Sequence, residues 1–191
     1  MRNLNKCLDE VFAPTIACHK LFESRDALIQ MLDTMTKSVG IPAMVVGGAA
    51  LPKYNYERTT KDIDVVTTLK DAYKLGDLLY GRGDFKFIEH SKFKHASGMD
   101  VNLCPEGVVV GHYKFPKPES DVPGLSYVSL PHLLAMKVQA KRLKDRGDYA
   151  ELVKRNDLSL EYIKNDVFPY LHEMDKKWAV RLWEQARKEM G

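Results

Sequence analysis

Apolar and polar residues follow two different periods along this chain, and each period predicts a different kind of element. Short segments at 43–46, 62–68, 85–88 and 98–103, in which apolar residues are continuous or alternate with polar ones, are typical of strands. Apolar residues three and four positions apart predict helices over 28–39, 69–80, 160–172 and 176–190. A further helix is predicted to begin near Leu130, with an apolar arc that continues to Leu143. The chain is therefore predicted to combine strands with helices and to end in helices.

A pair of glycines follows the first predicted strand. Gly47 and Gly48 come directly after the apolar run that begins at Ala43, and they precede a short predicted helix over 49–53. Glycine allows backbone N–H groups to approach a phosphate closely, and the start of a helix favours an anion. Turns from strand to helix often use glycine for other reasons, so this pair alone is a weak signal.

Two aspartates are placed one residue apart on the next predicted strand. Because side chains alternate between the faces of a strand, Asp62 and Asp64 should point to the same side, with Cα atoms roughly 7 Å apart. Two neighbouring carboxylates repel each other, and a divalent metal ion is the simplest partner for both. The alternative is an exposed strand end that carries two solvated aspartates.

A third acid and a lysine extend this set. On the strand predicted at 98–103, Asp100 shares one face with Asn102, and as a third carboxylate it would complete a two-metal set. Lys137 falls within the apolar arc of the helix that begins near Leu130. A buried ammonium is costly without an anion, so Lys137 should reach a carboxylate or a phosphate, or extend its charged end to solvent. On the other side of that helix, an ordinary charged face is predicted for Gln139, Arg142 and Arg146.

The order of these motifs resembles that of the nucleotidyltransferase superfamily, which has the polymerase-beta-like fold. The sequence Arg58-x-Thr60-x-Asp62-Ile63-Asp64 after the glycine pair is most similar to the AbiEii-type branch, found among bacterial toxin–antitoxin and abortive systems. The later pattern of that branch is matched in order by Lys137, Lys141-Arg142, Arg146 and Asp148, whereas Glu151 stands where aspartate is usual. The resemblance spans residues 41–152.

The resemblance implies an α/β (α+β) fold, with a mixed β-sheet nucleotidyltransferase core flanked by helices. Residues 1–128 would form this core with N-terminal helices, and residues 129–191 a C-terminal helical segment packed on it. Asp62, Asp64 and Asp100 are the implied catalytic and metal-binding residues. Nucleotide binding is assigned to Gly47, Gly48, Lys137 and Asp148.

The implied activity is transfer of a nucleoside monophosphate from an NTP to an acceptor hydroxyl, with Mg²⁺ or Mn²⁺ as cofactor. RNA ends, proteins and small molecules are candidate acceptors, and an antitoxin-like protein is a candidate partner. The chain would then be an enzyme, with a toxin-like role as one option. The alternative is a non-catalytic nucleotide-binding or antitoxin-like partner-binding module on the same fold.

Composition narrows the class of protein but does not select the acceptor. The 191 residues are 45% hydrophobic and 29% charged, which is ordinary for a globular protein. The net charge of +3 permits a phosphate-rich partner without requiring one. No apolar run has the ~20 residues of a membrane span and no signal peptide is recognised, so a cytoplasmic location without membrane association is expected. The sequence does not identify the NTP, the oligomeric state, or the roles of residues 1–22 and 105–124.

Cysteine usage agrees with a reducing compartment. Cys7, Cys18 and Cys104 are odd in number and lack the spacing of a disulfide framework or a zinc site, so we expect reduced cysteines that pack in the interior.

Overall fold

The computed structural model describes residues 24–110, 113–118 and 121–189. The strands are β1 (Pro42–Val46), β2 (Asp62–Thr67), β3 (Phe85–Glu89), β4 (Lys92–His95), β5 (Asp100–Pro105), β6 (Val109–Val110), β7 (Tyr113–Lys114) and β8 (Gly124–Tyr127). The helices are one over residues 24–38, a 3₁₀ helix η1 (Gly47–Tyr54), α2 (Leu69–Tyr80), α3 (Leu130–Ala140), α4 (Leu143–Arg155), α5 (Leu160–Tyr162), a π-helical turn η2 (Ile163–Val167), a 3₁₀ turn η3 (Phe168–Tyr170) and α6 (Glu173–Lys188). Of the N-terminal part expected to be helical, residues 1–23 lie outside the described residues, and the helix predicted over 28–39 is observed over 24–38.

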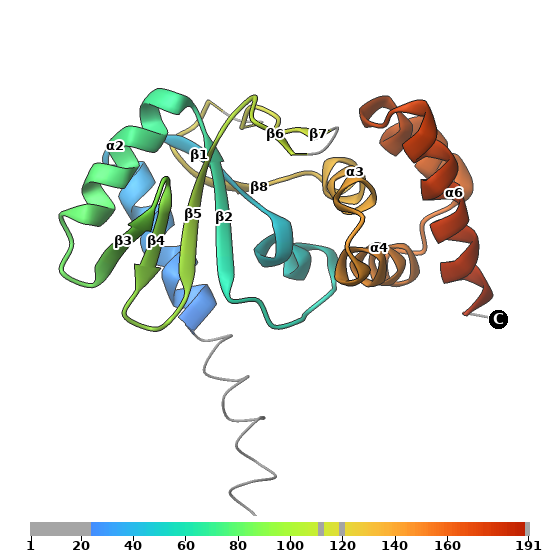
Figure 1. Cartoon of the computed structure of the whole chain (residues 1–191), viewed down its shortest axis with the longest axis horizontal. Helices are drawn as coiled ribbons and strands as arrows, with labels where there is room; N and C mark the ends of the chain where they lie inside the picture. The colour runs from blue at the N-terminus through green and yellow to red at the C-terminus, as the bar shows by residue number, and fades with distance from the viewer. Residues whose placement is uncertain (1–23, 111–112, 119–120, 190–191) are drawn as a thin grey trace, which may run out of the picture.

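The large sheet is mixed, as the family resemblance implied. Its six strands follow the order β3-β4-β5-β2-β1-β8, and β6 and β7 pair separately. Strand β2 is antiparallel to β1 and parallel to β5, while β8 is parallel to β1. Figure 1 shows this sheet on one side of the molecule and α3, α4 and α6 gathered on the other. The predicted fold class, a mixed sheet flanked by helices, is confirmed.

One face of the sheet forms the core and the other is polar at β2. Ile63 and Val65 are fully buried, whereas their neighbours Asp62 and Asp64 are only partly covered. Helix α2, predicted at the observed residues 69–80, packs on β2, β3 and β5 and buries Leu75 and Leu79 completely. Alternation along β2 therefore places the two aspartates on the face of the sheet that α2 does not cover.

The helix that begins at Leu130 is shorter than predicted. It ends at Ala140, because Lys141 adopts a left-handed conformation with a φ of 57°, and α4 begins at Leu143. Leu143, expected in the apolar arc, is 83% exposed, and Gln139, expected on the solvent side, is 5% exposed. Helical periodicity missed this break, since lysine is not a residue that usually ends helices.

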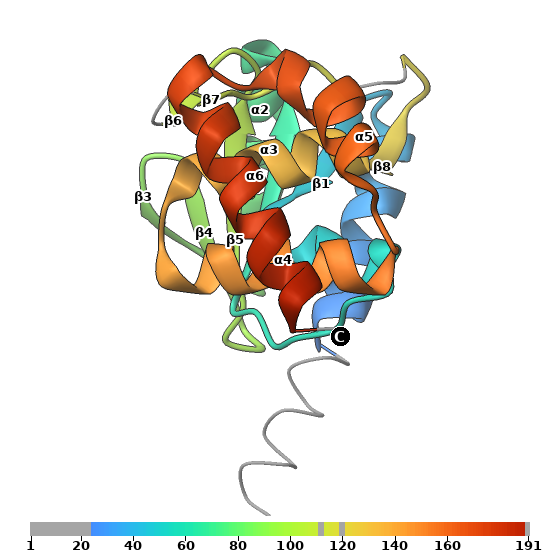
Figure 2. The ribbon, with the colours of Figure 1, turned by 90° about the vertical axis from the view of Figure 1, so that its right-hand side faces the viewer.

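The C-terminal region differs from prediction in a second way. The helix expected over 160–172 is a series of short turns, α5, η2 and η3, and Pro169 lies in the last of them, where proline disfavours a regular helix. Helix α6 begins three residues before the predicted start and crosses over α4, as Figure 2 shows. Strand β8 was not predicted, because its four residues follow a segment rich in proline and glycine. Within the described residues no helix is both long and apolar enough to span a bilayer.

Candidate functional site

The register of β2 and β5 aligns four polar side chains on one face of the sheet. Asp62 is opposite Asp100, and Asp64 is opposite Asn102. The Asp64 carboxylate accepts a hydrogen bond from Asn102 Nδ2 at 2.7 Å, and Asp62 accepts one from Thr60 Oγ1 at 2.5 Å. Three of the four corners of this array are therefore carboxylates and the fourth is an amide.

Asp100 is held by a lysine from the neighbouring strand. Lys92 Nζ of β4 lies 2.8 Å from Asp100 Oδ2, and Lys94 Nζ lies 3.9 Å from Oδ1. Asp100 Oδ1 is nevertheless buried and accepts no hydrogen bond within the described part of the chain. Asp100 is thus an ion-paired carboxylate with one oxygen still free to accept a ligand.

The two glycines pack directly against this array. Gly47 has a φ of +69°, and a Cβ at this position would lie 2.6 Å from Asp64 Oδ2. A Cβ on Gly48 would lie 2.9 Å from Thr60 Oγ1, the hydroxyl that donates to Asp62. Glycine is therefore required at 47 both for its backbone conformation and for its contact with Asp64.

Lys137 is buried among carboxylates. Its side chain is 5% exposed, and Nζ donates to Asp148 Oδ2 at 2.7 Å and to Asp145 Oδ1 at 3.0 Å. Asp145 and Asp148 lie one turn apart at the start of α4, and in a continuous helix Asp145 would be about 12 Å from Lys137 along the axis. The break at Lys141 therefore allows both carboxylates to reach Lys137.

Two arginines complete this cluster. Arg58, from the loop before β2, donates to both oxygens of Asp148 at 2.6 and 2.8 Å. Arg142, in the break between α3 and α4, donates from Nε to Asp145 Oδ2 at 2.5 Å. Burial alone would raise the pKa of Asp148, but the hydrogen bonds from Arg58 and Lys137 outweigh burial and lower it. We call Arg58, Lys137, Arg142, Asp145 and Asp148 the charge cluster.

A cavity of about 400 Å³ joins the carboxylate array to the charge cluster. Its polar wall is formed by Gly47, Asp64, Asn102, Lys137, Arg142 and Asp145, and its apolar wall includes Val108, Tyr113, Phe115 and Met136. Burial raises the pKa of Asp64, and the nearby charge of Asp62 adds to this, whereas the bond from Asn102 opposes it. Gly48, Asp62, Asp100 and Asp148 are not among the residues that line this cavity.

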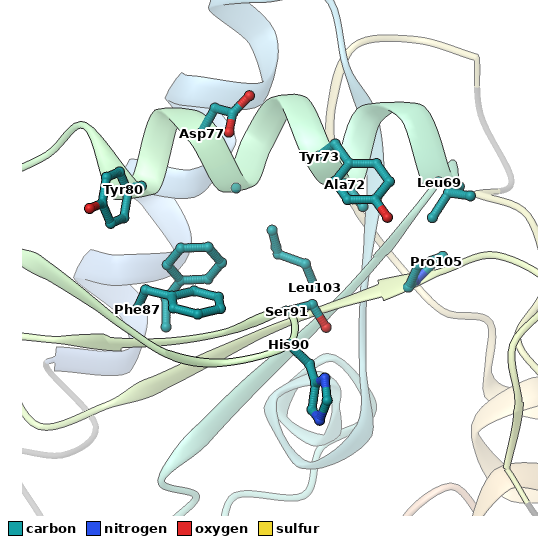
Figure 3. A pocket seen from close by; sticks show the side chains of 12 residues that line it. Leu69, Ala72, Tyr73, Asp77, Tyr80, Phe87, His90, Ser91, Leu103 and Pro105 are labelled. Atoms are coloured by element: carbon teal, nitrogen blue, oxygen red, sulfur yellow. The ribbon is translucent and has the colours of Figure 1, made fainter.

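A larger cavity, of about 530 Å³, lies between α2 and the strands β3, β4 and β5 (Figure 3). It is lined mainly by apolar and aromatic side chains such as Tyr73, Tyr80, Phe87 and Leu103. Leu103 alternates with Asn102 along β5, so this cavity lies on the face of the sheet that α2 covers. None of the predicted site residues lines it, and we therefore place the candidate site in the smaller, charged cavity.

The donor set is chemically suited to a hard divalent cation. Carboxylate oxygens are the ligands that Mg²⁺ and Mn²⁺ prefer, and Asp62, Asp64 and the buried, unbonded Oδ1 of Asp100 supply them on one face of the sheet. In the part of the chain that the structure describes, no three His, Cys, Asp or Glu side chains are already arranged as a metal site. Asp62 and Asp64 would therefore hold the ion first, and Asp100 would join through Oδ1, the oxygen that Lys92 does not pair with.

Some residues of the site were not found from the sequence. Asp145 was missed, although its spacing of three from Asp148 on a helix is a usable signal. Lys92 was missed because only strand pairing brings it to Asp100. Arg58 entered the sequence analysis only as part of the motif, and the structure pairs it with Asp148. Cys104, expected as a packing residue, is partly buried and free, and burial raises the pKa of its thiol to about 12.

Comparison with known proteins supports the fold. No protein-family model and no curated protein sequence matches this chain. Among solved structures, an antigenic nucleotidyltransferase-like protein from Paracoccidioides brasiliensis is 14% identical, with 88% of this chain and 90% of that chain aligned at a TM-score of 0.53. ANT(2")-Ia in complex with adenylyl-2"-tobramycin is also 14% identical over 86% of this chain and 98% of that chain, but its TM-score of 0.47 supports no conclusion here. The chain therefore has a nucleotidyltransferase-like fold.

Proposed function

We propose that this protein is a metal-dependent nucleotidyltransferase that moves a nucleoside monophosphate from an NTP to an acceptor hydroxyl. One observation carries the proposal. The Asp62–Asp64 pair lies on the open face of a nucleotidyltransferase-like sheet, and Asp64 faces a cavity whose wall also contains Lys137 and Arg142. Carboxylates and cations around one cavity match the two requirements of the reaction, a metal site and a place for a polyphosphate.

In the proposed reaction the acceptor oxygen attacks the α-phosphorus of the NTP. The bond from that phosphorus to the bridging oxygen of pyrophosphate breaks, and pyrophosphate leaves with the electron pair. A divalent cation, when bound, would neutralise charge on the phosphate oxygens at both ends of this displacement. Asp62 and Asp64 would hold the ion, and Asp100 would contribute its free Oδ1 and help to remove the proton of the acceptor hydroxyl.

The remaining site residues are proposed to bind the nucleotide. Gly47 and Gly48 would direct backbone N–H groups at the triphosphate from the start of η1. Lys137 would supply positive charge to the cavity wall, and Asp148 would fix the position of Lys137 through their 2.7 Å bond. Residues 1–128 as the core and residues 129–191 as the segment that supplies Lys137 and Asp148 stay a prediction.

The finer assignment rests on the order of sequence motifs. We propose the AbiEii-type branch because Lys137, Arg142 and Asp148 follow the aspartate pair in the order of that branch. A toxin-like role with an antitoxin-like partner, a cytoplasmic location and an RNA, protein or small-molecule acceptor belong to this proposal.

Label transfer tests the proposed function. The protein is incubated with each α-labelled NTP, Mg²⁺ or Mn²⁺, and separate pools of cellular RNA, protein and small molecules. We expect label from one or more NTPs to enter a single pool and Asp64→Asn to abolish this. If no pool is labelled under any condition, nucleotidyl transfer is the wrong function.

A non-catalytic nucleotide-binding module is the alternative, and the ion pair between Lys92 and Asp100 favours it. That pair already neutralises the third carboxylate without a metal ion. A protein that binds NTP with unchanged affinity whether or not Mg²⁺ is present, and that transfers no label, would support this alternative.

A further inference from the structure

The charge cluster satisfies Lys137 internally. Its ammonium has two carboxylate partners within 3.0 Å, and its side chain is almost fully buried. Asp148 is in turn bonded through both oxygens to Arg58, which is 24% exposed. Lys137 therefore has little capacity left to contact a ligand directly.

The cluster as a whole carries an excess positive charge. Its three cations, Arg58, Lys137 and Arg142, face two carboxylates, Asp145 and Asp148. Three positive charges against two negative ones leave one positive charge, and it must be borne where the cluster meets solvent.

Arg142 is the member of the cluster that is open to the cavity. Its side chain is 62% exposed, and it lines the cavity together with Gly47 and Asp64. A guanidinium has five N–H donors in a planar fork, and the bond from Nε to Asp145 uses one of them. In the described structure the two outer nitrogens of Arg142 have no other hydrogen bond or ion pair.

We infer that Arg142 is the residue that binds the β- and γ-phosphates of the incoming NTP. Asp145 fixes the guanidinium by its inner nitrogen, and the side chain stays 62% exposed, so the two outer nitrogens can donate two parallel bonds to two oxygens of a phosphate. Asp145 then holds Arg142 at the cavity, and Lys137 holds Asp145 in turn. This inference rests on the proposed function and names a group that the sequence had assigned to an ordinary charged face.

Arg146, in the first turns of α4, provides a matched control. It is four residues after Arg142, but its guanidinium lies 4.8 Å from the ring centre of Trp178 and borders a different cavity between α4 and α6. Arg142→Gln and Arg146→Gln change the net charge equally, so long-range electrostatics affects both variants alike.

The experiment measures affinity as a function of phosphate number. Four proteins are titrated in the presence of Mg²⁺: the wild type, Arg142→Gln, Arg142→Lys and Arg146→Gln. The ligands are the α,β-methylene analogues of the four ribonucleoside triphosphates and the matching NMPs and nucleosides. For Arg142→Gln we expect affinity for the triphosphate analogue to fall about 10- to 150-fold, the range for loss of a hydrogen bond to a charged group. Affinity for the nucleoside should stay unchanged, Arg142→Lys should lie between, and Arg146→Gln should match the wild type.

The outcomes separate this inference from the proposed function. Equal affinities of Arg142→Gln and the wild type for the triphosphate analogue would overturn the role of Arg142, and label transfer by the wild type would leave the proposed function intact. A loss of the same size for nucleoside and triphosphate would also overturn it, because that pattern indicates a general distortion of the cavity. A wild-type protein that binds none of the triphosphate analogues would overturn both.

Discussion

Replacing Lys137 by methionine tests the central contact of the charge cluster. The substitution keeps the length of the side chain and removes the charge from a residue that is 4% exposed. Two hydrogen bonds, to Asp145 and Asp148, are lost together. Removing one partner of a buried ion pair typically costs ~3–5 kcal/mol, because it leaves the other charge without compensation.

The structure places the expected loss at the lower end of that range. Asp148 keeps both bonds to Arg58, and Asp145 keeps the bond from Arg142. Neither carboxylate is left alone, so we expect the free energy of unfolding of the metal-free protein to fall by about 3 kcal/mol.

Urea unfolding of four variants measures this effect. Lys144→Met serves as the control, because Lys144 is exposed on α4 and its substitution should change stability by no more than about 0.5 kcal/mol. Asp148→Asn and its combination with Lys137→Met complete a double-mutant cycle, and the combined loss should be smaller than the sum by about 0.5–3 kcal/mol. Unchanged stability in Lys137→Met would refute the reasoning, since it would mean that the buried ammonium contributes nothing through its two carboxylates.

The carboxylates give three further predictions. Asp62→Asn and Asp64→Asn should each abolish label transfer, and wild-type transfer rates in both variants would exclude the metal site. In urea unfolding at pH 7, Asp64→Asn should leave the metal-free protein as stable as the wild type or more stable, because burial raises the pKa of Asp64 and disfavours its charged form. Asp100→Ala should lower the transfer rate by about 100-fold or more, while titration should find nearly unchanged affinity for the triphosphate analogues. Equal losses of transfer rate and of triphosphate affinity would instead place Asp100 among the residues that hold the nucleotide-bound metal ion. The pKa of Asp148 is below its ordinary value, so the stability that this carboxylate contributes is present above the ordinary pKa and is lost as pH falls through the folded-state pKa. Between pH 7 and 3 the free energy of unfolding should therefore fall less in Asp148→Asn than in the wild type. The same dependence of unfolding free energy on pH in both proteins would contradict the lowered pKa.

The sequence predicted best those features that depend on local pattern. Helix α2 was predicted at its observed residues because its apolar period is regular, and the structure adds a local cap, the Thr68 hydroxyl that accepts from Asp71 N. The burial of Lys137 followed from its place in the apolar arc of α3, which is also local information. The common face of Asp62 and Asp64 followed from strand alternation alone.

The features that the sequence did not predict depend on contacts between distant segments. Lys141 adopts a left-handed conformation that its residue type disfavours, and the break there lets Asp145 and Asp148 reach Lys137, a contact that no local period reveals. Lys92 and Asp100 meet only because β4 and β5 pair in one particular register. Helical periodicity therefore assigned Arg142 to a solvent face, although the break in the helix directs it to the cavity.

The contact between Gly47 and Asp64 offers a test in which backbone strain and steric contact can be separated. Gly40 has a φ of +71°, almost the same as the +69° of Gly47, but a Cβ on Gly40 would meet nothing within 4 Å. Gly40→Ala should therefore cost only the strain of a left-handed alanine, roughly 1–2 kcal/mol. Gly47→Ala adds a Cβ 2.6 Å from Asp64 Oδ2, which must force the carboxylate away from Asn102.

The difference between the two alanine variants isolates the steric contact at the site. Losing the charged bond between Asp64 and Asn102 should make Gly47→Ala less stable than Gly40→Ala by about 1.5 kcal/mol or more in urea unfolding, and only Gly47→Ala should lose label transfer. In an Asp64→Ala background the side chain that clashes is absent, so Gly47→Ala should then cost no more than Gly40→Ala does. Equal costs of the two substitutions in the wild-type background would show that Gly47 is needed for its backbone conformation alone, and that its packing does not hold the Asp64 carboxylate in place.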